Sequence, residues 1–297
     1  QYVFFNLWIL LYCFIWRPQV VYASEKNVCP VAYVIKILSK KIKVIYFEPM
    51  YAGEGVQIKP KFVRESRSRL AKNADLCLVP NDARLEKFVE EVGDHGNAIF
   101  AHNYPKNQDF DDFPLKEKLT TGRLKLFSFG CIGPDRLPIQ LFEALEALKD
   151  KVELVIAGMD APVGEKYSPI VIEEIKKRGL RDNVNYVGLI KKRSDVLKEC
   201  SKADVGLCFT GKTLISGVQP EFRTEGGSQR PFEYMGLGLV LLVTDLEEWE
   251  NFFVKDGYGY SCDSEDSNSI KEVLEHLYDN KDSLFEIGIR NRKKILE

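Results

Sequence analysis

Residues Ser216–Asp245 read SGVQPEFRTEGGSQRPFEYMGLGLVLLVTD, and this stretch decides the fold. It opens as a polar loop, continues as a short helical run over Gln229–Leu237, and ends in a near-continuous apolar strand, Leu239–Thr244. Loop, helix and strand in this order are typical of parallel α/β sheets, whose ligands bind beyond the carboxyl ends of the strands. The stretch therefore predicts both an α/β fold and the place of a ligand site.

Two of the carboxylates in this stretch, Glu225 and Glu233, are separated by seven residues. Glu225 lies in the loop beside the glycine pair Gly226-Gly227, and Glu233 lies in the first turns of the helix. Backbone N–H groups and the positive end of a helix dipole are close to both positions. We therefore expect both carboxylates to face a ligand.

Composition places the chain among ordinary globular proteins. Its 297 residues suffice for two domains, and its hydrophobic and charged contents are 45% and 29%. The formal net charge of −2 gives no general affinity for nucleic acid. Seven scattered cysteines without a Cys-x-x-Cys pair predict reduced core thiols in a cytoplasmic protein, and no disulfide framework or zinc site.

The opening run Val3–Trp16 is apolar except for Asn6. Fourteen residues are too few for a membrane span, so we expect a buried helix of the first domain. The alternative is the end of a membrane anchor, which would place the protein peripherally at a membrane. Because the chain begins at Gln1 and not at Met, we interpret it as a fragment or a trimmed chain.

Strands and helices alternate strictly along the rest of the chain, which predicts parallel sheets with helices on both faces. We expect a domain over residues 1–106, a linker over 107–122, a second domain over 123–264 and a helical region over 265–297. The expected strands are Gln19–Ala23, Lys43–Phe47, Leu76–Val79, Ala98–His102, Leu124–Gly130, Val152–Gly158, Val184–Ile190, Asp204–Phe209, Leu239–Thr244 and Gly257–Cys262.

The linker contains Asp109-Phe110-Asp111, an Asp-x-Asp motif that some metal-dependent glycosyltransferases use. A three-residue motif recurs by chance, and no apolar strand precedes this one. We therefore predict a solvated linker here and no metal site.

The run Gln229–Val240, QRPFEYMGLGLV, resembles the donor site of retaining glycosyltransferases of the GT-B fold, family 4 type, also called glycosyl transferases group 1. The chain departs from the usual family pattern at Val240, where proline is common, and it has a basic residue, Arg230, where one is usual. The positions that match are Phe232, Glu233, Tyr234, Met235, Gly238 and Asp245.

The resemblance implies a GT-B fold, in which two Rossmann-like parallel-sheet domains face a cleft. Ala74-Asp75, Pro80-Asn81 and Asn103-Tyr104-Pro105 resemble the end of the family's acceptor domain. About a hundred residues are few for that domain, so we expect the acceptor-side domain to be incomplete. The second half, from Leu124, would be the domain that binds the nucleotide sugar.

The resemblance also implies roles for single residues. Glu233 would bind the ribose hydroxyls of a nucleotide, because a carboxylate with two acceptor oxygens suits a cis-diol. Glu225 would lie against the transferred sugar and favour the positive charge that grows at the anomeric carbon. The backbone N–H groups of Gly226, Gly227 and Ser228 would bind the phosphate and the sugar.

Cationic residues and strand-end glycines complete the expected donor site. Arg230 and Lys212 would neutralise the diphosphate, and Gly188 would hold the base through its backbone. Gly130 ends the first strand of the second domain, where a glycine allows close approach of a phosphate. Relatives often have an arginine at the position of Cys131, so we take Arg136 as its substitute, with an arginine on a solvated turn as the alternative.

The implied reaction transfers a sugar, with retention, from a nucleotide diphosphate sugar to a hydroxyl of a glycan, a lipid-linked acceptor or a small molecule. It would need no metal and no further cofactor, because cations and N–H groups stabilise the departing diphosphate. Two alternatives remain: a non-catalytic protein that binds nucleotide sugars, and a sugar-nucleotide epimerase or hydrolase of the same architecture.

Overall fold

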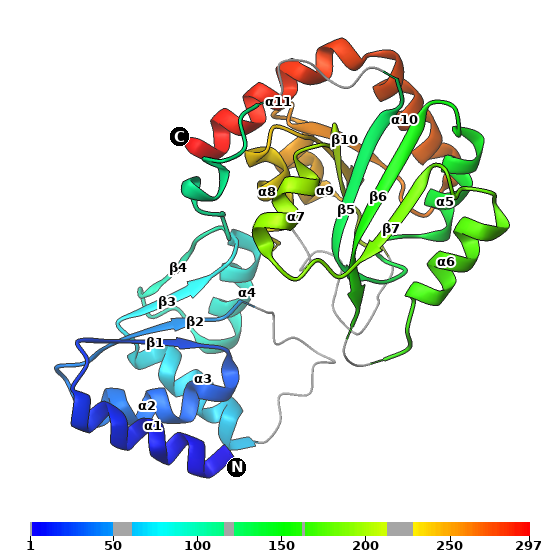
Figure 1. Cartoon of the computed structure of the whole chain (residues 1–297). Helices are drawn as coiled ribbons and strands as arrows, with labels where there is room; N and C mark the ends of the chain where they lie inside the picture. The colour runs from blue at the N-terminus through cyan, green and yellow to red at the C-terminus, as the bar shows by residue number, and fades with distance from the viewer. Residues whose placement is uncertain (1, 50–60, 116–121, 162–163, 213–227) are drawn as a thin grey trace. The chain divides into compact units, whose positions relative to one another are not determined.

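A computed structural model of the chain shows two compact units (Figure 1). The structure describes residues 2–49, 61–115, 122–161, 164–212 and 228–297. The N-terminal unit comprises the described residues up to Asn103, and the C-terminal unit comprises those from Tyr104 on. Each unit is an α/β layer structure with a parallel sheet, as the alternation of strands and helices predicts.

The N-terminal unit contains a four-stranded parallel sheet in the order β1-β2-β3-β4. Side chains of β2 and β3 alternate toward a core that α2, α3 and α4 cover. Tyr46, Cys77 and Ile35 are among its most buried members. The elements are α1 (Tyr2–Trp16), β1 (Val20–Ser24), η1 (Lys26–Val28), α2 (Cys29–Leu38), β2 (Lys43–Phe47), α3 (Lys61–Asn73), β3 (Leu76–Val79), α4 (Asp82–Val92) and β4 (Ala98–Phe100).

The expectation that the first helix is buried is wrong. Cys13 is the only buried residue of α1, and large apolar side chains such as Phe4, at 79% exposure, face outward. The reason is that α1 packs chiefly against α2, through one stripe that includes Ile9 and Leu10. Among the described residues, no helix combines the length and the hydrophobicity that crossing a membrane requires.

A strained backbone follows β1. Glu25 has φ 77° and ψ 150°, a region that glycine adopts easily and other residues do not. Such a conformation costs about 1–3 kcal/mol. Arg17, at φ 52°, lies just beyond α1 in the left-handed conformation that commonly ends helices. The strain at Glu25 has no comparable helix-ending role.

The C-terminal unit contains a six-stranded parallel sheet in the order β10-β9-β8-β5-β6-β7. The chain builds outward from β5 to β7 and then returns to the other side of β5 with β8 to β10, so the strand order reverses between β5 and β8. The strands are β5 (Leu124–Ile132), β6 (Val152–Asp160), β7 (Val184–Gly188), β8 (Val205–Cys208), β9 (Val240–Thr244) and β10 (Gly259–Cys262).

Helices cover both faces of this sheet (Figure 1). On one face, α5, α6 and α10 pack over side chains such as Leu126 and Leu242. On the other face, α7, α8 and the segment around Trp249 pack over Phe127 and Leu241. The helices are η2 (Asn107–Phe110), α5 (Ile139–Ala147), α6 (Ser168–Lys177), α7 (Arg193–Cys200), α8 (Arg230–Gly236), α9 (Glu247–Trp249), η4 (Glu250–Val254), α10 (Ser267–Asp279) and α11 (Lys281–Leu296).

The expectation of a solvated linker is wrong for Asp109 and Phe110. The side chain of Phe110 is completely buried and its ring lies over Gly236 in α8. Adding a Cβ atom to Gly236 would bring it within 2.2 Å of that ring. The segment η2 is thus a part of the C-terminal unit's core.

Candidate functional site

The reversal of strand order between β5 and β8 marks the edge at which ligands of open α/β sheets bind. At this edge, Gly130 of β5 has φ 116°. A Cβ atom on Gly158, its neighbour in β6, would lie 2.0 Å from the carbonyl oxygen of Gly130. The two glycines therefore let β5 and β6 approach each other closely where β5 ends.

Two arginines flank Gly130. The guanidinium of Arg230 is buried and lies 3.5 Å from the carbonyl oxygen of Phe129 and 3.3 Å from that of Phe209, which follows β8. The guanidinium of Arg136 lies 3.4 Å from the carbonyl oxygen of Cys131. Both cations thus lie at the carboxyl end of β5, and Arg230 also reaches the end of β8.

The helix α8 places Arg230, and all seven of its residues are buried. Tyr234 holds the helix against the sheet, since its hydroxyl accepts a hydrogen bond of 3.2 Å from the backbone N–H of Phe129. Its ring lies where Gly206 of β8 leaves room, because a Cβ atom on Gly206 would come within 2.3 Å of it. Burial raises the pKa of Tyr234, so the hydroxyl stays protonated.

Glu233 lies in the same helix and is 4% exposed. Arg193, the first residue of α7, donates to its Oε1 from Nε at 2.9 Å and also from Nη2. The Nη1 of Arg193 binds Asp109 of η2 at 2.7 Å. Among the described residues, Oε2 of Glu233 receives no hydrogen bond, so this oxygen remains able to accept one from a ligand hydroxyl.

Burial and the ion pair act in opposite directions on Glu233. Burial raises the pKa of its carboxyl group, and the hydrogen bonds from Arg193 lower it, with burial the larger effect. Burial alone would lower the pKa of Arg193, but Asp109 and Glu233 raise it. The guanidinium therefore remains charged and keeps Glu233 oriented.

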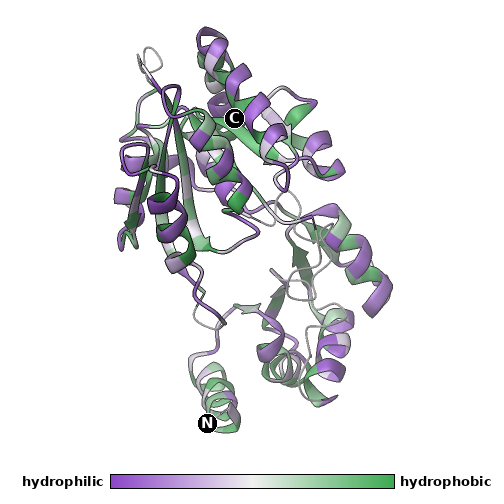
Figure 2. Ribbon diagram, turned by 90° about the vertical axis from the view of Figure 1, so that its right-hand side faces the viewer, coloured by the Kyte–Doolittle hydropathy of each residue, from purple (hydrophilic) through white to green (hydrophobic). Residues whose placement is uncertain are grey.

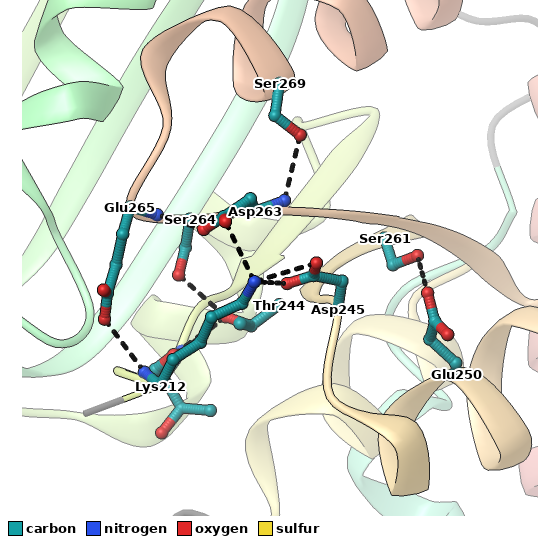
Figure 3. Close-up of polar contacts among 10 residues, drawn as sticks. Lys212, Thr244, Asp245, Glu250, Ser261, Asp263, Ser264, Glu265 and Ser269 are labelled. Carbon is teal, nitrogen blue, oxygen red and sulfur yellow. Dashed lines mark hydrogen bonds and ion pairs between the residues drawn. The ribbon is translucent and has the colours of Figure 1, made fainter. Parts of the chain in front are cut away.

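Lys212 lies on the same sheet edge, beyond β8, within a polar cluster (Figure 3). Its Nζ is 2.7 Å from Oδ1 of Asp245 and 3.0 Å from Oδ2 of Asp263, residues that follow β9 and β10. Its backbone N–H donates to Glu265 at 3.1 Å. The positive charge of Lys212 is therefore already balanced by two carboxylates.

The structure brings most of the described candidates to one edge of the C-terminal sheet. Gly130, Arg136 and Arg230 lie together at the end of β5, and Glu233 lies one turn further along α8. Ser228 precedes α8. Gly188 ends β7 with φ 69°, and no described atom lies within 4 Å of the position that a Cβ atom would take on it. Glu225, Gly226 and Gly227 lie outside the described residues, so their roles stay predictions.

Sequence reasoning missed Arg193 and misjudged Asp109. Arg193 stands in the run Lys191-Lys192-Arg193 soon after β7, and a basic run behind a strand end was the available signal. The motif Asp109-Phe110-Asp111 carried no signal for an ion pair 84 residues away. A fold was needed to bring these side chains together.

Within the part of the chain that the structure describes, no three His, Cys, Asp or Glu side chains are grouped to hold a metal ion. All seven cysteines lie in the described residues and have free thiols; Cys131 is exposed and the other six are buried.

A family model described as glycosyl transferases group 1 matches residues 109–294. This range covers most of the C-terminal unit, including both arginines at the end of β5 and the Glu233 pair. No curated protein sequence is significantly similar to the chain.

Solved glycosyltransferase structures share the fold. The Anabaena protein HepE in complex with UDP has a TM-score of 0.75 at 12% identity, covering 98% of this chain and 76% of HepE. A trehalose-phosphate synthase (UDP-forming) from Burkholderia xenovorans, in complex with glucose-6-phosphate, has a TM-score of 0.72 at 14% identity, covering 99% and 73%. For sucrose-phosphate synthase from Thermosynechococcus elongatus the values are 0.69, 14%, 98% and 72%. At such identities the likeness establishes the fold, which is that of GT-B glycosyltransferases.

Proposed function

Because the chain belongs to the glycosyl transferases group 1 family, we propose that it moves a sugar from a nucleotide diphosphate sugar to an acceptor hydroxyl, with retention, as a family 4 type enzyme. The observation that supports this proposal is the pair of guanidiniums at the strand-order reversal. Arg136 and Arg230 both border Gly130 there. A diphosphate is the ligand that two such cations suit best, since each guanidinium can bind phosphate oxygens in a bidentate manner.

Glu233 extends this site by one helical turn. Arg193 holds its Oε1, which leaves Oε2 as an acceptor on an oriented carboxylate. In the proposed complex Oε2 accepts a hydrogen bond from a ribose hydroxyl, and Gly188 offers its backbone to the base. In this arrangement Gly188 binds the base of the donor, Glu233 binds the ribose, and the two arginines bind the diphosphate.

The arginines do their main work as the bond to the sugar breaks. Negative charge grows on the leaving diphosphate at that point, and cations placed beforehand lower the barrier. In the proposed mechanism this stabilisation needs no metal and no further cofactor. Glu225 is proposed to lie at the sugar, and Lys212 to join the diphosphate site only where a ligand displaces it from Asp245 and Asp263.

The test is turnover of UDP-glucose, the ligand in one HepE crystal structure, followed by other nucleotide sugars, with acceptors that include glucose and glucose-6-phosphate. We expect release of nucleoside diphosphate, an α-linked product by proton NMR, and no effect of EDTA. Glu233→Ala should weaken nucleotide binding about 10- to 100-fold, since a hydrogen bond to a charged group contributes about 1.5–3 kcal/mol. Arg230→Lys should reduce turnover more than binding.

The matched control is Glu247→Ala, which removes an exposed carboxylate from the start of α9. Binding without turnover across the whole panel would favour the non-catalytic alternative. An altered sugar without an acceptor would favour an epimerase. If EDTA abolished the activity and Mg²⁺ or Mn²⁺ restored it, the metal-free mechanism would be contradicted.

For the location we propose the cytoplasmic side of a membrane, with α1 in peripheral contact with the lipid surface. Figure 2 shows the helix at the N label mostly in the green of hydrophobic residues. Trp8, Tyr12 and Trp16 form a ladder on it, with ring centroids 5.5 Å and 5.7 Å apart. Aromatic residues beside cations favour the interface of an anionic bilayer, and the segment 1–47 contains six basic residues and one acidic residue.

Vesicle sedimentation tests this location. The full chain should sediment with vesicles containing phosphatidylglycerol, less with pure phosphatidylcholine, and less again at high salt. Trp8→Ser with Trp16→Ser should abolish the binding, whereas Ile170→Ser with Ile172→Ser, exposed apolar residues of α6, should leave it unchanged. Equal binding by both double variants would refute the contact.

A further inference from the structure

The carboxyl edge of the N-terminal sheet holds two glutamates, of which one is buried and the other is exposed. Glu48 follows β2, and Glu25 follows β1 beside it, with its backbone N–H bound to the carbonyl oxygen of Phe47 at 3.1 Å. Glu48 is buried, and its carboxylate accepts from Arg67 at 2.6 Å and 2.7 Å and from Tyr46 at 2.5 Å. Glu48 is therefore a fully bonded member of the core.

Glu25 is exposed, and its carboxylate has no hydrogen bond or ion pair among the described residues. Its backbone is nevertheless fixed, because its N–H bonds to Phe47 and its carbonyl oxygen accepts from Val28 at 3.3 Å. The same backbone has the unfavourable φ of 77°. A glycine would remove this strain, so the presence of a glutamate calls for a reason outside the packing of the fold.

From this combination we propose that Glu25 is an acceptor-binding residue, whose carboxylate accepts a hydrogen bond from a hydroxyl of a polyhydroxylated acceptor. The carboxyl edge of a parallel sheet is the edge that binds ligands, and a fixed carboxylate loses little freedom when it binds one. The inference rests on the proposed transfer reaction and names a residue that its acceptor touches. Glu48 cannot take this role, because Arg67 and Tyr46 occupy its oxygens.

The test compares the wild-type 297-residue chain with Glu25→Gly, Glu25→Gln and Arg17→Gly. Arg17→Gly is the matched control, because it also replaces an exposed residue of positive φ but lies beyond α1, away from the sheet's carboxyl edge. Measurements are the urea midpoint, calorimetric binding of UDP, and ligand-observed NMR of glucose, glucose-6-phosphate, N-acetylglucosamine and maltose with UDP present.

We expect Glu25→Gly to raise the urea midpoint, to bind UDP within twofold of the wild type, and to weaken sugar binding at least tenfold. Glu25→Gln should weaken sugar binding at an unchanged midpoint, and Arg17→Gly should leave both ligands' binding unchanged. Wild-type sugar binding by Glu25→Gly, or no sugar bound by the wild type, overturns the proposal for Glu25. Failure of the wild type to bind UDP or any nucleotide sugar would instead contradict the proposed function.

Discussion

At the scale of single residues, the pairing of Glu233 with Arg193 combines a stability cost with the binding role that we propose for Glu233. Glu233 is buried, and burial raises the pKa of its carboxyl group despite the guanidinium beside it. Since the folded protein holds this proton more tightly than the unfolded chain does, the free energy of unfolding falls as pH rises through the raised pKa. A buried carboxylate that costs stability is typical of a residue that serves a ligand.

Replacing Arg193 by glutamine should enlarge this cost. The variant loses the bonds that favour the charged carboxylate, so the pKa of Glu233 rises further. We expect the free energy of unfolding to fall by about 1–3 kcal/mol at pH 8, and the loss to be smaller at pH 5, because a smaller fraction of Glu233 is charged there and in need of the guanidinium. Urea denaturation of both proteins at the two pH values measures this difference.

The double variant Arg193→Gln, Glu233→Gln supplies the control for the pH effect. With no titrating group at position 233, its loss relative to Glu233→Gln alone should be the same at both pH values. A loss from Arg193→Gln that is independent of pH would mean that Arg193 acts through its contact with Asp109 and not through Glu233.

At the scale of elements, the short segment η2 sets one side of the site. Phe110 anchors it against Gly236 of α8, and Asp109 beside it binds Arg193. Gly236→Ala would place a Cβ atom 2.2 Å from the far end of the Phe110 ring, so the ring must move. We expect a loss of about 1–3 kcal/mol in stability and weaker nucleotide binding, measured by denaturation and calorimetry.

A double-mutant cycle separates this contact from other effects of the alanine. Phe110→Leu removes the ring atoms that the new Cβ atom would meet. In that background Gly236→Ala should become neutral or stabilising, by up to about 1 kcal/mol, since alanine is the better helix residue. An equal loss in both backgrounds would show that the damage lies elsewhere in α8.

The sequence predicted the order and type of the elements because each strand is a compact apolar run between helical periods. The ends of the strands differ by one or two residues: β5 and β6 continue to Ile132 and Asp160, two residues beyond the expected ends, and β7 ends at Gly188, two residues before the expected end. The exposure of α1 was not predictable in the same way. A helix that is apolar on all sides reads as buried, and its sequence does not reveal how few neighbours cover it.

The candidate site was predictable where its residues are close in sequence and hidden where they are distant. Glu233 and Arg230 share one helix, and the family pattern points to both. Arg193 reaches Glu233 from α7, and Asp109 of η2 binds Arg193 although the two residues lie 84 positions apart in the sequence. The balance of Lys212 by Asp245 and Asp263 likewise depends on three neighbouring strand ends, which sequence order does not place side by side.

At the scale of the whole molecule, the chain has two separate cores. Among the described residues, the buried members of one hydrophobic cluster lie within residues 13–88 and those of the other two lie within residues 110–295, so the units share no buried member. The proposed donor-binding residues Arg136, Arg230 and Glu233 all belong to the C-terminal unit. A nucleotide should therefore stabilise one unit directly and leave the intrinsic stability of the other unchanged.

Thermal unfolding with UDP as the probe tests this division. At a UDP concentration of 100 times Kd the C-terminal unit should gain about 2.7 kcal/mol, which raises its midpoint by about 5–10 °C for a unit of this size. Trp249 reports this transition by fluorescence, because it is 1% exposed and belongs to the C-terminal unit, whereas Trp8 and Trp16 are at least 60% exposed before unfolding. The remaining calorimetric transition, from the N-terminal unit, should not move.

Glu233→Ala should abolish most of the shift at the same UDP concentration, because it removes the proposed ribose contact. An equal shift of both transitions in the wild type would contradict a nucleotide site built from the C-terminal unit alone.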